Sequence, residues 1–404
     1  MFEELARRYG TPLFVYDLDM AARQVSRLVD ALPSASALYY SLKANPHPDV
    51  VEAMVACGCL LEVSSLAELR IALTAGAAPD AILMTGPALS KEDIRASIGL
   101  GLRKFSVESE ANLARLHSTA RATRTVVRYL LRVNTPNLGR GRLRMAGRPT
   151  QFGTDLDAIL DAPTLTSTTE FCEFAGLHFY SLSNAESEDD LVTTAQANLS
   201  AALAIGLAHR VGFSEIDLGG GFSAPYGTHD STPAYPTLRP RLEELYDEAF
   251  QGATRPALAF ESGRYLAAEL GTLVATVQDV KMSKGRQFVI LDAGVNHLGG
   301  MGAIGKTLPM QFDVSSVESS TTPTSPSTIV GPLCTPVDII SRAVQLPNIR
   351  PGAVVSIPAV GAYGLTASLI GFISRPIATE ISVSKGNPIS VTRLKLERSP
   401  VEAR

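Results

Sequence analysis

The sequence predicts a parallel (β/α)8 barrel joined to a separate β-rich domain. The chain has 404 residues, which is more than one domain of average size, and a (β/α)8 barrel takes about 250 residues as one unit. Between about residues 37 and 262, short apolar segments alternate with helical patterns. From about residue 265 short β-rich segments with turn signals replace them. We expect an N-terminal segment (1–34) that adds to the β-domain, a barrel (35–264) and a β-rich domain (265–404).

The predicted barrel strands are short apolar runs separated by helical patterns or long connections. They cover residues 37–42, 60–63, 81–84, 104–107, 126–133, 175–180, 215–218 and 257–260. One intervening helix begins with Ser90-Lys91-Glu92-Asp93, the pattern of a capping box. Long helical patterns at 189–209 and 240–250 separate the last three strands. This order of strands and helices is typical of a parallel sheet closed into a barrel.

The predicted β-domain contains strands at 271–280, 287–292, 354–357 and 377–383, and we expect an N-terminal strand at 13–16 to join them. Two other stretches read as loops. The segment 315–328 is rich in Ser, Thr and Pro and predicts a mobile loop. The segment 134–151 predicts a second long loop, which carries Arg140, Arg142, Arg144 and Arg148.

Composition narrows the class of protein. The net charge is −4, with 45% hydrophobic and 19% charged residues, so the sequence predicts neither nucleic acid nor an anionic membrane as a partner. We see no signal-peptide pattern and no apolar run near the length of a membrane span. Four cysteines are too few for a disulfide framework, and Cys57 and Cys59 read as small, largely buried thiols. We therefore expect a cytoplasmic protein.

Polar and glycine residues follow most of the predicted strands, where a (β/α)8 barrel collects its catalytic groups. They are Lys43, Glu62 with Ser64, Arg132 with Asn134, His178 with Tyr180 and Ser183, Gly219-Gly220-Gly221, and Glu261-Ser262-Gly263-Arg264. Any one of them is explained by an ordinary polar loop. Their common position predicts an active site at one rim.

Two of these features suggest a chemistry. The glycine triplet at 219–221 would let backbone N–H groups approach a phosphate, although a tight turn explains it equally well. Lys43 ends an apolar, aromatic strand, where desolvation would favour a nucleophilic amine and Schiff-base chemistry. A solvated surface lysine is the alternative.

Six motifs then occur in a family-specific order. They are Tyr40-Ser41-Leu42-Lys43-Ala44-Asn45, Gly176-Leu177-His178, Gly219-Gly220-Gly221-Phe222, Glu261-Ser262-Gly263-Arg264, Cys334-x-x-x-Asp338 and Gly361-Ala362-Tyr363. Together they resemble the diaminopimelate/ornithine decarboxylase family, barrel enzymes that use pyridoxal 5′-phosphate (PLP). The resemblance extends from about residue 11 to about residue 380.

The resemblance implies a role for each matching residue. Lys43 would form the Schiff base with PLP, and Glu261 would face the pyridine nitrogen and keep it protonated. Glu62, Arg132, His178 and Tyr180 would lie near the lysine or the cofactor ring. The phosphate would be held by Ser183, Gly219, Gly220, Gly221, Gly263, Arg264 and Tyr363.

The resemblance also implies a homodimer with shared active sites. In this family the loop that carries the cysteine reaches the other subunit's site, so Cys334 of the partner subunit would protonate Cα after decarboxylation. Thr335, Asp338 and Tyr363 would then lie on the substrate side of that site.

Four departures from the family pattern bear on the substrate. Tyr180 replaces a histidine that stacks on the cofactor ring, and Leu182 replaces the glycine after it. Thr335 stands where the family usually has an acidic residue for a distal ammonium group, and 297–310 lacks the Arg-Pro motif that binds a distal carboxylate.

These departures argue against lysine, ornithine, arginine and diaminopimelate, because an unpaired buried ammonium is costly. They resemble the natural-product branch, some of whose members decarboxylate aminoacyl groups tethered to carrier proteins. The arginines from Arg140 to Arg148 would then dock an acidic acyl carrier protein, unless they belong to a solvated loop.

The leading hypothesis is therefore a PLP-dependent L-amino-acid decarboxylase in a biosynthetic pathway. A PLP-dependent racemase or epimerase is the first alternative, although barrel racemases typically place an arginine where Glu261 stands. A non-catalytic regulator is the second, against which the retained motif residues argue. A metal-dependent barrel hydrolase is the third, and the sequence gives no cluster of ligands for it, since His178 is the one histidine that ends a predicted strand.

Overall fold

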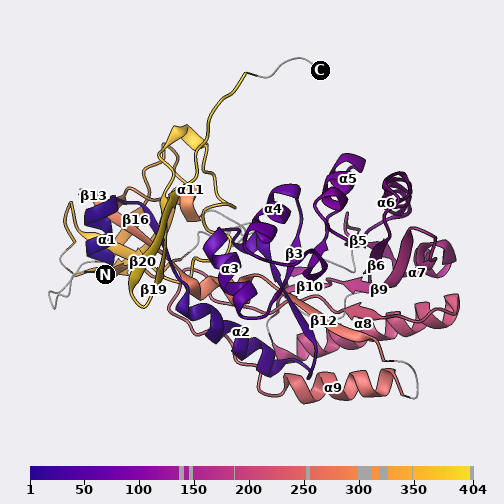
Figure 1. Ribbon diagram of the computed structural model, residues 1–404. Coiled ribbons are helices and arrows are strands. Elements are labelled where there is room, and N and C mark those ends of the chain that lie inside the picture. Colours follow the sequence, from indigo (N-terminus) through magenta and orange to yellow (C-terminus); the bar gives the residue numbers. More distant parts are fainter. Residues whose placement is uncertain are drawn as a thin grey trace. The chain divides into compact units, whose positions relative to one another are not determined.

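The computed structural model describes residues 1–135, 141–144 (backbone only), 149–185, 187–251, 255–298, 311–317, 326–347 and 349–400 (Figure 1). The chain forms two compact units. One, here called the barrel unit, comprises Ala22–Ala224 and Thr232–Leu266. The other, the β unit, comprises Met1–Ala21, Pro225–Ser231 and Ala267–Arg404.

The barrel unit is a closed parallel β-barrel, which confirms the predicted fold class. Its strands are β2 (Ala37–Ser41), β3 (Leu60–Val63), β4 (Ile82–Met84), β5 (Lys104–Val107), β6 (Val127–Asn134), β9 (Cys172–Phe179), β11 (Glu215–Asp217) and β12 (Ala257–Ser262). Pairing of β12 with β2 and of β5 with β6 closes the ring. Apolar side chains from several strands, including Tyr39, Leu83 and Leu130, fill its interior. The fixed register brings the carboxyl ends of all the strands to one rim.

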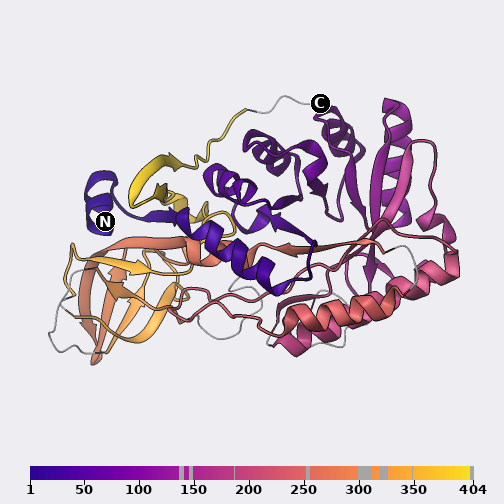
Figure 2. The same cartoon turned by 60° about the horizontal axis from the view of Figure 1, so that its bottom comes forward.

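Helices follow the strands around the barrel (Figures 1 and 2). They are α2 (Asp19–Ala31), α3 (Pro48–Ala56), α4 (Leu66–Thr74), α5 (Lys91–Gly99), α6 (Glu110–Thr123), α7 (Leu156–Leu160), α8 (Glu188–His209) and α9 (Leu238–Ala249). Serine N-caps begin four of them, and at α5 the predicted capping box between Ser90 and Asp93 is present. Each cap satisfies a backbone N–H that the helix itself leaves unpaired.

Within the described residues, α8 is the one helix long and apolar enough to cross a membrane by length and composition alone. Its first turn carries Glu188, Asp189 and Asp190, and it lies beside α9 in both views (Figures 1 and 2). Its buried side chains, from Leu191 to Ile205, pack inside the barrel unit. A core helix of a globular domain passes the same test, and these contacts identify α8 as such a helix.

The predicted loop 134–151 is wrong in part, because β7 (Gly141–Arg144) lies within it and pairs antiparallel with β10 (Leu182–Ala185). A short strand, β8 (Thr154–Asp155), extends the sheet beside β6. Arg140, Arg148 and the side chains of Arg142 and Arg144 lie outside the described residues.

The β unit is built on a mixed sheet, and its N-terminal strand β1 (Leu13–Asp17) lies inside that sheet, as predicted. Strand β1 pairs antiparallel with β13 (Gly271–Ser283) and parallel with β19 (Thr379–Ser384). The remaining strands are β14 (Arg286–Leu291), β15 (Ser315–Ser316), β16 (Pro326–Val330), β17 (Ile339–Gln345), β18 (Val354–Ile357) and β20 (Asn387–Arg393). Helix α1 (Phe2–Tyr9) contributes Leu5 to the core, where it packs with Leu13 and Val274.

The predicted mobile loop at 315–328 is wrong at both ends. Its first residues form β15, and Ser327 and Thr328 are buried in β16, which pairs parallel with β14. Residues 318–325 lie outside the described residues. Thr fits a pleated sheet well, so Ser/Thr-rich composition alone did not distinguish a strand from a loop.

Candidate active site

Lys43 and Glu62 form an ion pair at the ends of β2 and β3. The Lys43 Nζ atom lies 3.1 and 3.0 Å from the two carboxylate oxygens of Glu62. Glu62 is buried, whereas 39% of the Lys43 side chain is exposed. The expected desolvation of Lys43 is therefore wrong: this lysine is held by a buried carboxylate and faces solvent.

Glu62 stays ionised despite its burial. Burial alone would raise its pKa, but the charge of Lys43 and hydrogen bonds, including one donated by Thr85 at 2.5 Å, lower that pKa to about 2. The hydroxyl of Ser64 donates a further, longer hydrogen bond to Glu62. A permanent negative charge therefore stands next to the Lys43 amine.

A second cluster of titratable groups lies deeper, between β9, β11 and β12. His178 Nε2 and Glu261 Oε1 are 3.3 Å apart, and each side chain is 1% exposed. His178 Nδ1 lies 2.7 Å from the hydroxyl of Ser106. Neither His178 Nε2 nor Glu261 Oε1 has a hydrogen-bond partner within the described part of the chain, because the 3.3 Å approach lacks hydrogen-bond geometry.

Asp217 completes this cluster. It is fully buried, and its Oδ1 atom accepts a hydrogen bond from the backbone N–H of Gly219 at 2.8 Å. Burial and the neighbouring charge of Glu261 raise the pKa of Asp217 well above its ordinary range. The raised pKa favours the protonated form of Asp217.

The turn after β11 carries the glycine triplet. Gly219 and Gly221 have positive φ angles of 72° and 109°. A Cβ atom on Gly220 would lie 2.1 Å from the backbone oxygen of Glu261, and one on Gly219 would lie 2.2 Å from that of Phe179. The turn therefore requires glycine, and its close packing fixes the backbone N–H groups at the rim.

Gly263 plays a related role next to Lys43. A Cβ atom there would lie 2.7 Å from Cβ of Ala44, so glycine allows the end of β12 to pack on the lysine-bearing segment. Arg264 follows as the first residue of the short helix α10 (Arg264–Ala267) and is half-buried.

Arg132 and Tyr180 line the site between β6 and β9. Arg132 Nη1 donates to Glu108 Oε1 at 2.9 Å, and both side chains are buried. The Tyr180 ring centre lies 5.4 Å from Lys43 Nζ and 5.9 Å from Arg132 Cζ. The tyrosine that departs from the family pattern thus contacts two cations through its ring face.

The β unit holds the other predicted site residues. Cys334 is an exposed thiol on the segment between β16 and β17, and Thr335 follows it. Asp338 is buried, and its two carboxylate oxygens accept the backbone N–H groups of Val295 at 2.8 Å and Leu333 at 2.7 Å. Its carboxylate thus ties the Cys334 segment to α11 (Val295–Leu298).

Tyr363 also lies in the β unit. Its φ angle is 56°, which is unusual for a non-glycine residue, and its carbonyl oxygen accepts a hydrogen bond from the Tyr226 hydroxyl. Ser183, by contrast, belongs to the barrel unit, where it lies on β10 and pairs with β7. The barrel unit therefore brings together Lys43, Glu62, Arg132, His178, Tyr180, the glycine turn, Glu261 and Gly263.

A family model described as "Pyridoxal-dependent decarboxylase, pyridoxal binding domain" matches residues 18–268. These residues include the Lys43–Glu62 pair, the glycine turn and Glu261. The chain belongs to this family.

Relatives and solved structures agree with this assignment. The chain is 30% identical over 395 residues to the L-glutamyl-[BtrI acyl-carrier protein] decarboxylase of Niallia circulans, covering 95% of this chain and 91% of that protein. It is 30% identical over 378 residues to the 2-[(L-alanin-3-ylcarbamoyl)methyl]-2-hydroxybutanedioate decarboxylase of Staphylococcus aureus, covering 90% and 92%. The diaminopimelate decarboxylase of M. jannaschii with L-lysine matches in fold, with a TM-score of 0.86, 22% identity and coverage of 95% and 90%.

The family and its decarboxylase members show that the chain is a PLP-dependent carboxy-lyase acting on an amino-acid substrate. The site fits that cofactor. The Glu261 Oε1 atom accepts no hydrogen bond from the residues that the structure describes, so it could accept one from a protonated ring nitrogen. The glycine turn leaves no room for side chains where a phosphate would approach. The amine of Lys43 lies at the same rim, at the end of β2.

Sequence reasoning missed several residues of this site. Asp217, Glu108 and Thr85 were not predicted, although each follows or ends a barrel strand. Asp217 lies opposite His178 in the register of β11 and β9, a relation that appears only once the barrel closes.

The expectation that the sequence offers no ligand cluster for a metal is also wrong. His178, Asp217 and Glu261 place one potential ligand atom each within 4.8 Å of one another. The family that the chain belongs to is described by pyridoxal and not by a metal.

Proposed function

We propose that the rim of the barrel unit holds PLP, with Lys43 as the amine that carries it and Glu261 as the acceptor for its ring nitrogen. The observation that carries this proposal is the buried Glu261 Oε1 atom, which accepts no hydrogen bond from the described residues. It lies on β12, the strand adjacent to β2 that leads to Lys43. Ser183, the Gly219–Gly221 turn, Gly263 and Arg264 would bind the phosphate.

When bound, PLP would take up the electron pair released from Cα as carbon dioxide leaves. Glu261 would hold a proton at the ring nitrogen, and the buried Asp217 lies beside it, with its pKa raised by burial and by the charge of Glu261. Glu62, with its pKa of about 2, keeps its charge through the neutral range and steadies a positive Nζ on Lys43. Tyr180 presents its ring face to the same amine.

The lysine assignment has a direct test. Borohydride reduction of the PLP-loaded protein, followed by peptide mass spectrometry, should place the cofactor on Lys43. Lys43→Ala should lose the visible absorbance band of the lysine-bound cofactor. The control Lys91→Ala, at an exposed position where α5 begins, should keep that band. A band that survives in Lys43→Ala would contradict the assignment.

We further propose a homodimer in which Cys334 of the partner subunit protonates Cα. The exposed thiol on a segment fixed by Asp338 supports this role. Mixing Lys43→Ala with Cys334→Ala protein should restore roughly a quarter of wild-type activity, because random reassortment leaves one intact site in each mixed dimer. No restoration would contradict shared sites.

The substrate we propose is an L-amino acid carried on an extended chain, including an aminoacyl group on an acyl carrier protein. Two relatives are named for such substrates: a glutamyl carrier protein and an alaninyl carbamoyl conjugate of a hydroxybutanedioate. Thr335 supports the proposal, because it offers no charge for a distal ammonium. A screen for carbon dioxide release across free amino acids and aminoacyl conjugates tests it, and turnover of free lysine or ornithine alone would contradict it.

The four free cysteines support a cytoplasmic location.

A further inference from the structure

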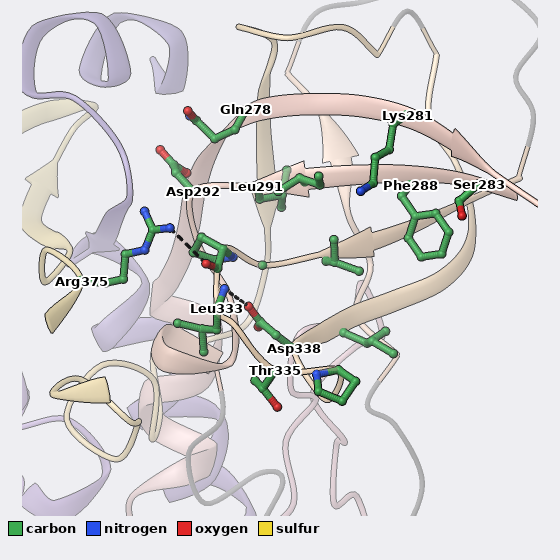
Figure 3. A pocket seen from close by; sticks show the side chains of 16 residues that line it. Gln278, Lys281, Ser283, Phe288, Leu291, Asp292, Leu333, Thr335, Asp338 and Arg375 are labelled. Atoms are coloured by element: carbon green, nitrogen blue, oxygen red, sulfur yellow. Dashed lines mark hydrogen bonds between the residues drawn. The ribbon is translucent and has the colours of Figure 1, made fainter. Parts of the chain in front are cut away.

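The β unit contains a groove of about 690 Å³, all of whose lining residues belong to that unit (Figure 3). Apolar side chains of β14 and β16, including Phe288, Ile290 and Val330, line it. Leu333 and Thr335 line another side. Cys334 stands between these last two residues, so the groove borders the proposed proton donor. Of the residues given a role above, Thr335 and Asp338 belong to its lining, and the rest of the groove has no role so far.

The groove carries cations at its two ends. Figure 3 shows Lys281 beside Phe288 at one end and Arg375 at the other. Both side chains are exposed, and Arg375 Nη2 donates a hydrogen bond to the Pro332 carbonyl at 3.1 Å. These charges favour a ligand with anionic groups.

Two carboxylates also line the groove, and the charge of one, Asp338, interacts with Arg375. Both carboxylates accept hydrogen bonds from the protein itself. Asp292 accepts hydrogen bonds from the Thr11 hydroxyl at 2.5 Å and the Thr276 N–H at 2.9 Å. Asp338 accepts the two backbone N–H groups described above. The groove therefore combines apolar walls with positively charged ends.

Thr335 also suits an anionic ligand. An acidic residue at this position, as in related decarboxylases, would place a negative charge in the wall of the groove. The volume lies within the range of about 300–1,000 Å³ typical of pockets for drug-sized molecules, which exceed a free amino acid in size.

We propose that this groove binds the distal part of an extended substrate: a chain of methylene and amide groups that carries an oxyanion and is covalently joined to the amino acid being decarboxylated. The inference rests on the proposed function, because it takes Cys334 as the group that meets Cα. The apolar walls pack against the chain, and Lys281 and Arg375 bind its oxyanion. That oxyanion is the phosphate of a carrier-protein arm or the carboxylates of a conjugate.

Calorimetric titration of the PLP-loaded protein with two probes that lack the amino acid tests the inference. The probes are 4′-phosphopantetheine, for the carrier arm, and citrate, for a polycarboxylate conjugate. Wild-type protein should bind at least one, and Lys281→Glu or Arg375→Glu should weaken that binding by about tenfold or more. The control Arg286→Glu reverses an exposed cation on β14 outside the groove and should change neither probe binding nor activity.

Three results would overturn the inference: no binding of either probe, equal weakening in the Arg286→Glu control, or a change of oligomeric state in the groove variants by light scattering. The last result would mean that a second copy of the chain covers the groove. Carbon dioxide release from side-chain methylamides of amino acids, which keep a free α-carboxylate, separates the two proposals. Release without probe binding contradicts the groove, whereas probe binding without release from any amino-acid compound contradicts the proposed function.

Discussion

Removing the charge of Glu62 should flatten the dependence of stability on pH. In the folded protein its pKa is lowered from 4.5 to about 2 against the opposing effect of burial, chiefly by Lys43. Because each pKa unit corresponds to about 1.4 kcal/mol, this lowering is worth about 3 kcal/mol. A carboxyl with a lowered folded pKa contributes its stability above pH 4.5 and loses it as the pH falls through 2.

The assay is urea unfolding of the cofactor-free protein, in which Lys43 is available to Glu62. Unfolding is followed by circular dichroism, since the chain has no Trp. Between pH 7 and pH 3.5, wild-type protein should lose roughly 1.5 kcal/mol more than Glu62→Gln, about half of the full effect. Lys43→Met should raise the folded pKa of Glu62, because it removes the main cause of the lowering, and so reduce the stability that wild type loses at low pH.

Glu68→Gln is the matched control, on the neighbouring helix α4. Burial raises the pKa of Glu68, so its ionisation destabilises the folded state and the control should change the pH dependence in the opposite sense. Parallel stability curves for wild type and Glu62→Gln would refute the account of the Lys43–Glu62 pair.

Three other predictions concern different parts of the site. Gly220→Ala should cost about 1–3 kcal/mol of stability and weaken PLP binding in a fluorescence titration. The control Gly212→Ala, with open space around the added Cβ, should do neither. Equal effects of the two substitutions would contradict the tight-turn argument. Iodoacetamide at pH 8 should alkylate exposed Cys334 long before Cys59, since burial raises the pKa of Cys59 to about 12. Labelling is followed by mass spectrometry, and Cys59 labelled first would count against the structure. Asp338→Asn should leave one buried N–H unpaired, at a cost of about 1–3 kcal/mol. Hydrogen exchange at the Cys334 segment should then become faster, and unchanged exchange would argue against the anchoring role of Asp338.

The barrel could be predicted because strands and helices alternate along the sequence, and their apolar residues recur with different periods. The small antiparallel sheet of β7 and β10 could not, since a strand rich in Gly and Arg has no apolar alternation to reveal it. Strand β16 was missed for a similar reason, because Ser327 and Thr328 pair within the sheet despite a composition typical of loops.

The candidate site was predicted where a motif and a strand end coincide, as at Lys43, Gly219 and Glu261. Asp217 was missed because its proximity to Glu261 and His178 follows from barrel closure and not from spacing in the sequence. The environment of Lys43 was misjudged for the same reason: the apolar strand before it was visible, but the approach of Glu62 from the next strand was not.

The central claim is that this protein decarboxylates an amino-acid substrate with PLP held at Lys43 and Glu261. Its most direct test uses amino acids that are joined to the conjugate through the side chain and carry ¹³C in a free α-carboxylate. The measurement is the release of ¹³C-labelled carbon dioxide by the PLP-loaded protein. We predict labelled carbon dioxide in equal amount to the amine product, abolished in Lys43→Ala. Loss of optical activity without carbon dioxide, or a protein that takes up no PLP, would contradict the claim.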